Sequence, residues 1–328
     1  MKAVSTRATP LVVAALAACI VAACGSAASS VSEPATQAPP SVTPTSSVTT
    51  PVQRSVPHVM VIVEENRGYA ATLGSCSADP YLCSLASSYA SLISWYGIAH
   101  PSAPNYLALE SGSVQGVSSD CTPDGGGCGP FQSLDLGAQL SSAGIPWLAY
   151  MESMPSPCDR VGGAGDYAEK HNPFMYFSAE RGSGCSAHVL PYPGAGSMSA
   201  TLDSSAPADF VWITPNLAND MHDGSVAEGD AWLHVNLPLV LASAWFANHG
   251  TVIITMDEND ASPSGSCCGN AAGGRVPMVV VSANARGRGA IAVPGDHYTT
   301  LRTIEAAFGL RLLGNAASAP AAFTALFG

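Results

Sequence analysis

Basic residues are scarce in this chain of 328 residues, which has 12 lysines and arginines against 24 aspartates and glutamates. Without residues 1–24, which hold Lys2 and Arg7, 10 basic and 24 acidic residues remain, a net charge of −14. Nucleic acid and anionic membrane surfaces repel such a chain. We therefore expect no nucleic-acid partner, and membrane contact would need a lipid anchor.

Long hydrophobic runs are also lacking. The stretch Leu11–Ala23 is too short to span a bilayer comfortably, and the two basic residues before it are typical of an export signal. Its end, Val21-Ala22-Ala23-Cys24, resembles a bacterial lipoprotein signal with Cys24 as the lipid acceptor. We expect an exported protein that is lipid-anchored to the outer face of the cell membrane. If Cys24 is not lipidated, the segment would be an ordinary secretory signal that is cleaved nearby, and the protein would be secreted.

Charged residues are few in the next segment, residues 25–55, which is rich in Ser, Thr, Pro, Ala and Val. That composition suits an extended tether and cannot build a core. About 270 residues follow, enough for one large α/β domain, and they show no solenoid-type repeat. We predict a signal peptide at 1–24, a tether at 25–55 and a catalytic domain at 56–328.

Eight cysteines remain after the signal, an even number that argues for disulfides rather than zinc thiolates in an exported protein. Short spacings favour Cys76–Cys83 and Cys121–Cys128 as local pairs, and Cys158–Cys185 would close a longer loop. The adjacent Cys267 and Cys268 bond either each other or other partners, so the sequence leaves the connectivity open.

Apolar runs alternate with helical patterns along the domain. We expect strands at His58–Val63, Leu92–Ile98, Pro146–Met151, Asp209–Ile213, Thr251–Thr255 and Val276–Val281. We expect helices at Tyr81–Ser94, Tyr106–Glu110, Ser133–Ser142, Ala231–Ala247 and Thr299–Phe308. This alternation predicts an α/β fold with a doubly wound, mostly parallel sheet and helices on both faces. Residues 111–135 and 155–205 are expected to be disulfide-pinned insertions above the sheet, where substrate loops belong.

Two of the predicted strands end in acidic residues. Val59–Val63 runs into Glu64-Glu65-Asn66, and Val252–Thr255 is followed closely by Asp257-Glu258-Asn259-Asp260. Such β-branched runs are typical of strands buried on both faces, and open α/β sheets bind ligands at the carboxyl ends of their strands. If the two ends meet in one sheet, a cation would relieve the repulsion between their carboxylates. The pattern therefore predicts a metal site.

A third block is His100-Pro101-Ser102-Ala103-Pro104-Asn105-Tyr106, between a strand and a helical run. A hydroxyl at a helix N-terminus lies where backbone amides favour phosphate, and a nearby cation would lower its pKa and make it a nucleophile. The alternative is that Ser102 merely caps the helix. Asn105 would either donate to a phosphoryl oxygen or cap the helix as well.

Together with His297-Tyr298 and Leu301–Glu305, these blocks resemble the bacterial phosphoesterase family of the alkaline-phosphatase-like superfamily. That family groups phospholipase C enzymes with secreted acid phosphatases, including a mycobacterial acid phosphatase that acts on phosphoinositides. The resemblance covers residues 57–312 and implies hydrolysis through a phospho-enzyme intermediate. It implies Ser102 as the nucleophile and a metal held by Glu65, Asn66, Asp257 and Glu258.

Three histidines complete the predicted site. His222 follows the Asp209–Ile213 strand and would protonate the leaving alkoxide or hold a phosphate oxygen. His297 starts the last helical run and is the other candidate acid, whereas His171 resembles a family histidine beside the phosphate. The position of His100 leaves its role open. A histidine acid would give an acidic or near-neutral pH optimum.

The oxygen donors suit one divalent cation, Mg²⁺, Ca²⁺ or Mn²⁺, with Zn²⁺ also compatible. A second metal on Asp220, His222, Asp296 and His297 is the alternative, as in two-zinc members of the superfamily. One metal is favoured, because this second set lacks a clear Asp-x-x-x-His pair.

The resulting prediction is a metal-dependent phosphomonoesterase, an acid phosphatase working through a phosphoserine. Its substrates would be phosphorylated small molecules or lipid head groups, phosphoinositides among them, because no apolar lid for acyl chains is evident. A phospholipase C-type phosphodiesterase and a non-catalytic surface lipoprotein that binds a ligand are the alternatives. A sulfatase is disfavoured because Ser102-Ala103-Pro104-Asn105-Tyr106 lacks the arginine of the Cys/Ser-x-Pro-x-Arg motif.

Overall fold

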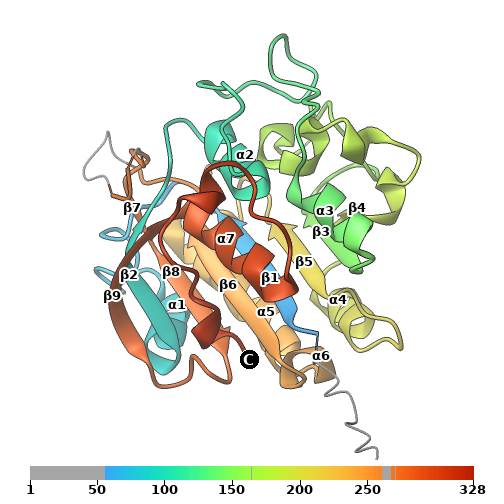
Figure 1. Ribbon diagram of the computed structural model, residues 1–328. Helices are drawn as coiled ribbons and strands as arrows, with labels where there is room; N and C mark the ends of the chain where they lie inside the picture. The colour runs from blue at the N-terminus through green and yellow to red at the C-terminus, as the bar shows by residue number, and fades with distance from the viewer. Residues whose placement is uncertain (1–55, 164, 261–266, 270) are drawn as a thin grey trace, which may run out of the picture. The chain divides into compact units, whose positions relative to one another are not determined.

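The computed structural model describes residues 56–163, 165–260, 267–269 and 271–328 (Figure 1). The predicted signal peptide, the lipid acceptor Cys24 and the tether at 25–55 lie outside the described residues and stay predictions. Within the described part of the chain, no helix combines the length and the apolar character needed to cross a bilayer.

One sheet of nine described strands forms the centre of the domain (Figure 1). The strands are β1 His58–Glu64, β2 Ala90–Tyr96, β3 Trp147–Met151, β4 Val189–Pro191, β5 Phe210–Thr214, β6 Gly250–Met256, β7 Arg275–Val276, β8 Met278–Ser282 and β9 Gly289–Asp296. Their order is β4-β3-β5-β1-β6-β8-β2-β7, with β9 also paired to β2. The strands from β4 to β6 pair in parallel, and β8 runs antiparallel to β6 and β2. The predicted mostly parallel α/β sheet is confirmed.

The central strands are buried along their whole length. Every residue of β1, β5, β6 and β8 is buried, as expected for apolar runs covered on both faces. The pairing of β1 with β6 extends from His58 opposite Gly250 to Glu64 opposite Met256. This register brings the ends of both strands to the same edge of the sheet.

The helices form two groups. They are α1 Pro80–Ser88, α2 Ala103–Ser111, α3 Leu136–Ala143, α4 Ala195–Leu202, α5 Val226–Leu241, α6 Ala244–Ala247 and α7 His297–Phe308. Helix α2 contacts α3 and α7, whereas α5 contacts α1, α4 and α6. Figure 1 shows α7 crossing in front of β1 and β6. Both faces of the sheet are covered, as predicted for a doubly wound fold.

Several element boundaries differ from the prediction. Helix α1 ends at Ser88 rather than Ser94, because the chain enters β2 at Ala90. The single helix expected at Ala231–Ala247 is two helices, since Ser243 caps α6 by accepting a bond from the Phe246 amide. The short β4 and β7, the edge strand β9 and helix α4 were not predicted.

Within the described ranges, four disulfides pin the loops: Cys76–Cys83, Cys121–Cys128, Cys158–Cys185 and Cys267–Cys268. The three pairs favoured by spacing are confirmed, and the adjacent cysteines bond each other. The expected insertion at 155–205 holds four short 3₁₀ helices, η1 Glu169–His171, η2 Pro173–Tyr176, η3 Ala179–Arg181 and η4 Cys185–Ala187, together with β4 and α4.

Candidate active site

The two acidic strand ends meet, as the sequence predicts. The Asp257 amide donates to the Glu64 carbonyl at 3.1 Å, and the Asn66 amide donates to Asp257 Oδ1 at 3.1 Å. Glu65, Asp257 and Glu258 are buried, and Asn66 is half-buried. Residues that are about 190 positions apart in the chain therefore share one acidic centre at the carboxyl edge of the sheet.

The Ser102 hydroxyl points into this centre. Its Oγ donates to Glu65 Oε2 at 3.0 Å and lies 3.3 Å from Glu258 Oε1. Ser102 precedes the first residue of α2, but its side chain makes no capping bond. The Ala103 amide of the same helix donates to the Asp120 carboxylate at 3.0 Å. The interpretation of Ser102 as a mere helix cap is therefore wrong.

A close approach of backbones places the serine loop. A Cβ at Gly97 would lie 2.7 Å from the Asp257 carbonyl oxygen and 3.1 Å from Glu258 Cα. Only glycine fits so near a neighbouring backbone. Gly97 thus allows the loop after β2 to lie against the end of β6, although β8 separates the two strands in the sheet.

Burial dominates the electrostatics of the acidic centre. It raises the pKa of Asp257 to about 7 and, with the Asp257 charge, the pKa of Glu258 to about 9. Burial and then the Asp257 and Asp220 carboxyls raise the pKa of Glu65 well above its usual range. Glu65 Oε1 and Asp257 Oδ2 are buried without a hydrogen-bond partner among the described residues. Such oxygens fit a divalent cation, which would replace the missing partners.

His171 lies deep beside the same carboxylates. It is 1% exposed, with Nε2 3.3 Å from Glu65 Oε1 and Nδ1 3.5 Å from Asp220 Oδ2. Its ring stacks on Tyr106, with centroids 5.1 Å apart and planes 11° apart. Burial lowers the pKa of His171 well below its usual value, so the imidazole is neutral. It offers one N–H donor and one lone pair.

His222 lies next to His171, with ring centroids 5.7 Å apart. Its Nδ1 pairs with Asp223 Oδ1 at 2.7 Å, and its backbone amide donates to Asp220 Oδ1 at 2.7 Å. The His222 side chain is 26% exposed, unlike that of His171. His222 therefore lies at the edge of the site, where solvent reaches its side chain.

Ligand atoms of Glu65, His171 and His222 lie within 4.8 Å of one another, close enough to share a metal ion. This group differs from the predicted set of Glu65, Asn66, Asp257 and Glu258, and the two sets have Glu65 in common. Glu65 therefore belongs both to a set of oxygen donors and to a set that adds two imidazole nitrogens.

His297 and Asn105 have structural partners. His297 is buried, its Nε2 hydrogen-bonds to the Asp257 carbonyl, and burial lowers its pKa to about 4. The Asn105 amide accepts from Ile98 at 2.7 Å and Ala99 at 3.0 Å, and it donates to Ala99 at 2.9 Å. These contacts favour positioning roles, in which His297 holds the β6 end and Asn105 holds the serine loop.

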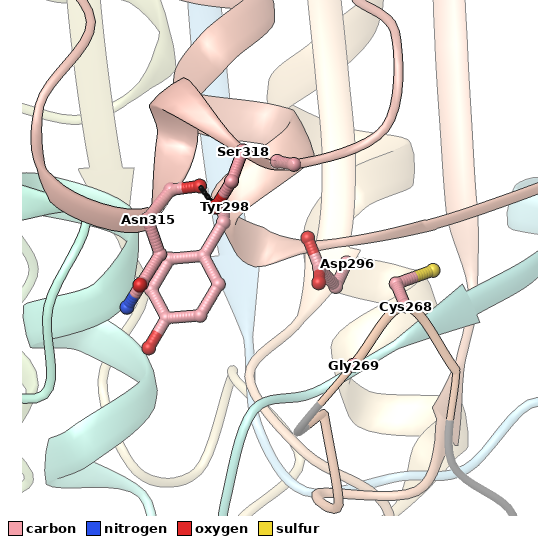
Figure 2. Close-up of a pocket in the computed structure, with 7 residues that line it drawn as sticks. Cys268, Gly269, Asp296, Tyr298, Asn315 and Ser318 are labelled. Carbon is pink, nitrogen blue, oxygen red and sulfur yellow. Dashed lines mark hydrogen bonds between the residues drawn. The ribbon is translucent and has the colours of Figure 1, made fainter.

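The alternative second metal set does not converge. Asp296 caps α7 by accepting from the Thr299 amide at 2.9 Å, and His297 contacts the Asp257 backbone. Asp220 and His222 lie instead beside His171. Asp296 also lines a neighbouring pocket of about 180 Å³, where Figure 2 shows it opposite Tyr298, Asn315 and Ser318.

Sequence reasoning missed several contacts of the site. His100 Nδ1 pairs with Glu258 Oε2, and Asp220 faces His171. Tyr106 is fully buried under His171, with its hydroxyl beside the Glu65 carboxylate. Tyr106 stands in the serine block, four residues after Ser102, so helical spacing was the signal that could have placed it near the site.

Comparisons with known proteins show what the chain is similar to. A profile of the phosphoesterase family matches residues 75–311. The chain is 36% identical over 268 residues to the phosphatidylinositol-3-phosphatase of Mycobacterium tuberculosis, covering 80% of each chain. It is 25% identical to an acid phosphatase of Aspergillus fumigatus, over 73% of this chain and 52% of the relative.

Solved structures support the fold alone. A Vibrio parahaemolyticus protein of the alkaline phosphatase superfamily superposes with a TM-score of 0.53 at 11% identity, covering 78% of this chain and 67% of the other. The lipoteichoic acid synthase LtaP from Listeria monocytogenes superposes with a TM-score of 0.55 at 10% identity, covering 82% and 79%. At such identities the likeness shows a shared architecture and no shared substrate.

Proposed function

We propose that this chain, which belongs to the phosphoesterase family and is a hydrolase of phosphoric esters, is a metal-dependent phosphomonoesterase that works through a phosphoserine on Ser102. The observation that carries the proposal is the Ser102 hydroxyl, which is 1% exposed and hydrogen-bonded to Glu65 rather than to its own helix. A serine that only capped α2 would not need three carboxylates of distant strand ends around it.

The buried oxygens of Glu65 and Asp257 support a resident cation, held by Glu65, Asn66, Asp257 and Glu258. When bound, a hard divalent cation would neutralise these carboxylates and lower the pKa of the serine hydroxyl. The alternative set of Glu65, His171 and His222 offers two nitrogen donors and would favour zinc.

In the proposed first step, Ser102 Oγ attacks phosphorus in line while its proton passes to Glu65 Oε2, 3.0 Å away. The bond from phosphorus to the leaving oxygen breaks, and His222 supplies a proton to the departing alcohol. The neutral His171 imidazole donates an N–H to a phosphoryl oxygen. In the second step, water attacks phosphorus and gives a proton to His222. The bond from phosphorus to Ser102 Oγ breaks, Glu65 returns its proton to the serine oxygen, and phosphate leaves.

His222 is preferred over His297 as the acid. The His222 side chain is partly exposed, whereas His297 is buried and bonded to the Asp257 carbonyl. Since burial lowers the pKa of His297 to about 4, its imidazole is neutral near neutral pH, and its one N–H donates to the Asp257 carbonyl. We therefore assign the leaving-group proton to His222.

We propose phosphomonoesters as substrates, including phosphoinositide head groups, because one relative of similar length is a phosphatidylinositol-3-phosphatase. The chain spans only about half the length of the acid phosphatase relatives, which support the reaction class rather than a substrate. The disulfides of the described residues support export, since such bonds persist in oxidising compartments. Lipid anchoring through Cys24 stays part of the proposal.

The test is phosphate release from para-nitrophenyl phosphate, with and without a chelator, by wild type, Ser102→Ala and Asp257→Asn. We expect the chelator and each substitution to abolish release, with added divalent metal restoring the wild type. Activity that survives both substitutions would refute the assigned site. A protein that binds phosphate esters equally well with or without Ser102, and hydrolyses none, would be the non-catalytic lipoprotein.

A further inference from the structure

A lysine lies beside the acidic centre. The chain has two lysines, Lys2 and Lys170, and Lys170 directly precedes the buried His171. Its Nζ donates to Asp120 Oδ2 at 2.7 Å, and the lysine side chain is 21% exposed. His171 Nε2 lies 3.3 Å from Glu65 Oε1, so the lysine is next in the chain to a residue that contacts the acidic centre.

Asp120 joins this ammonium to the nucleophile. Its Oδ1 accepts from the Ala103 amide at 3.0 Å, and its Oδ2 accepts from Lys170. Ala103 follows Ser102 in the chain, so a single carboxylate separates the lysine from the backbone of the nucleophile. One carboxylate thus connects the ammonium to the N-terminus of α2.

The pair is held from both sides. Asp120 precedes Cys121, which is bonded to Cys128. The hydroxyl of the fully buried Tyr176 donates to the Cys121 carbonyl at 2.5 Å and lies 3.5 Å from the Lys170 carbonyl. One tyrosine therefore fixes the backbone beside both charged residues. A surface ion pair with a merely incidental role would not need this support.

The charge of the substrate explains what such a lysine does. A phosphomonoester carries close to two negative charges at neutral pH, whereas a diester carries one. The carboxylates around Ser102 repel both kinds of ester, and they repel the doubly charged monoester more strongly. A fixed ammonium offsets this repulsion, and its gain grows with the charge of the phosphoryl group.

We infer that Lys170, oriented by Asp120, binds a non-bridging oxygen of the substrate phosphoryl group and sets the preference for monoesters over diesters. The inference rests on the proposed phosphatase function and extends it to the residue that selects the substrate class. Lys170 is the binding residue, and Asp120 is a positioning residue that acts through it.

The experiment compares kcat/KM for para-nitrophenyl phosphate and bis(para-nitrophenyl) phosphate at pH 7, in wild type, Lys170→Met and Lys170→Arg. In Lys170→Met, kcat/KM should fall about 30-fold for the monoester and about fivefold for the diester. The lost ammonium attracts the two negative charges of the monoester more strongly than the single charge of the diester. The ratio of the two kcat/KM values then falls about sixfold. Lys170→Arg keeps the charge and should restore most of the ratio.

Three further measurements separate a binding role from a structural one. The inhibition constant of inorganic phosphate should rise about tenfold in Lys170→Met, since the product has the same phosphoryl oxygens. Asp120→Asn keeps an acceptor for Ala103 but loses the ion pair, so its ratio should fall less than that of Lys170→Met. Arg160→Met is the matched control: Arg160 belongs to the same insertion and pairs with Asp124 at 3.1 Å, and its loss should leave the ratio unchanged.

The two possible failures are distinguishable. If the metal-loaded wild type hydrolyses neither ester, the proposed function fails. If the wild type is active but Lys170→Met lowers both substrates equally, or leaves the phosphate inhibition constant unchanged, this inference is overturned while the proposed function stands. An equal fall of the ratio in Arg160→Met would also overturn it, because the effect would then be one of net charge.

Discussion

Two clusters of buried carboxyl groups lie in this domain, and they differ in what surrounds them. The site cluster consists of Glu65, Asp220, Asp257 and Glu258, and the structural cluster consists of Glu110, Asp135, Glu180 and Glu305. Burial raises the pKa of residues in both, to about 8 for Asp220 in the first and to about 8 for Glu180 and Glu305 in the second.

Helix ends and turns bind one oxygen of three carboxyls in the structural cluster. Glu110 accepts from the Gly137 amide at 2.9 Å, Asp135 caps α3 through Ala138 at 2.8 Å, and Glu305 accepts from Leu313 at 2.8 Å. The site cluster instead faces a serine hydroxyl and imidazoles. Raised carboxyl pKa values therefore do not mark an active site by themselves; the neighbouring nucleophile and histidines do.

The largest difference between the two clusters is expected when one carboxyl in each is replaced by an amide. Glu65→Gln removes an oxygen donor shared by both candidate metal sets and the acceptor of the Ser102 proton. We expect kcat/KM for a phosphomonoester to fall at least about 1,000-fold, together with a loss of bound metal.

Its matched control is Glu305→Gln, whose amide oxygen still accepts from Leu313. The control should retain activity within about twofold, because the substituted group touches no site residue. Steady-state kinetics and metal analysis of both purified variants give the readout. Equal losses in the two variants would remove the distinction between the clusters.

The two histidines at the site edge should differ next most. His222→Asn removes the proposed acid, so kcat should fall about 100-fold for an alkyl phosphate and much less for a nitrophenyl phosphate, whose leaving group needs no proton. His297→Asn disturbs only a backbone contact and should affect both substrates alike. A leaving-group dependence in His297→Asn, and none in His222→Asn, would reverse the assignment.

A smaller effect is expected at Tyr106, which stacks on His171 with its hydroxyl beside Glu65. Tyr106→Phe keeps the stack, so kcat should fall about fivefold, whereas Tyr106→Leu also frees the imidazole and should cost about 30-fold. Rates at saturating substrate distinguish the two. Full activity in Tyr106→Leu would show that the stack does not position His171.

The structural cluster should affect the stability of the protein rather than its activity. Burial raises the pKa of Asp135 to about 6, and burial with the Asp135 charge raises that of Glu180 to about 8. The folded chain therefore binds protons that the unfolded chain has released above about pH 5. Its free energy of unfolding falls as pH rises from 5 to 8, and the Tm of the metal-saturated protein should drop by roughly 3–10 °C.

Glu180→Gln should flatten this profile, because the amide has no proton to lose. Differential scanning calorimetry of wild type and variant at matched metal concentrations makes the comparison. A wild-type Tm that rises over this interval, or the same slope in both proteins, would contradict the account of the cluster.

The strands that carry the site were predictable from the sequence. Val59–Val63 and Val252–Thr255 are β-branched, apolar runs of the kind found at the centre of a sheet. Glu65 and Asp257 come just after these runs, so their position at the edge of the sheet could be predicted as well. The border at Ser88 and Ala90 was not predictable, because α1 and β2 share one apolar stretch whose division depends on the pairing of β2 with β8 and β9.

The insertions show the limit of local reasoning. His171 was expected near phosphate from the resemblance, but its neighbours Asp220 and Tyr106 come from other parts of the chain. The contact of Lys170 with Asp120 joins two loops 50 residues apart, and no periodicity encodes it. Asn105 illustrates the reverse case, since its spacing suits both a phosphate donor and a loop brace, and the contacts favour the brace.

The central claim is that Ser102 carries the phosphoryl group between the two half-reactions. The most direct measurement is an acid quench of the metal-loaded wild type during turnover of a phosphomonoester, followed by mass spectrometry of the peptide that contains Ser102. We predict a phosphate mass increase on Ser102 that appears with substrate, decays when substrate is exhausted and is absent from Ser102→Ala. Steady turnover with no phosphorylated Ser102 at any quench time, or turnover that persists in Ser102→Ala, would contradict it.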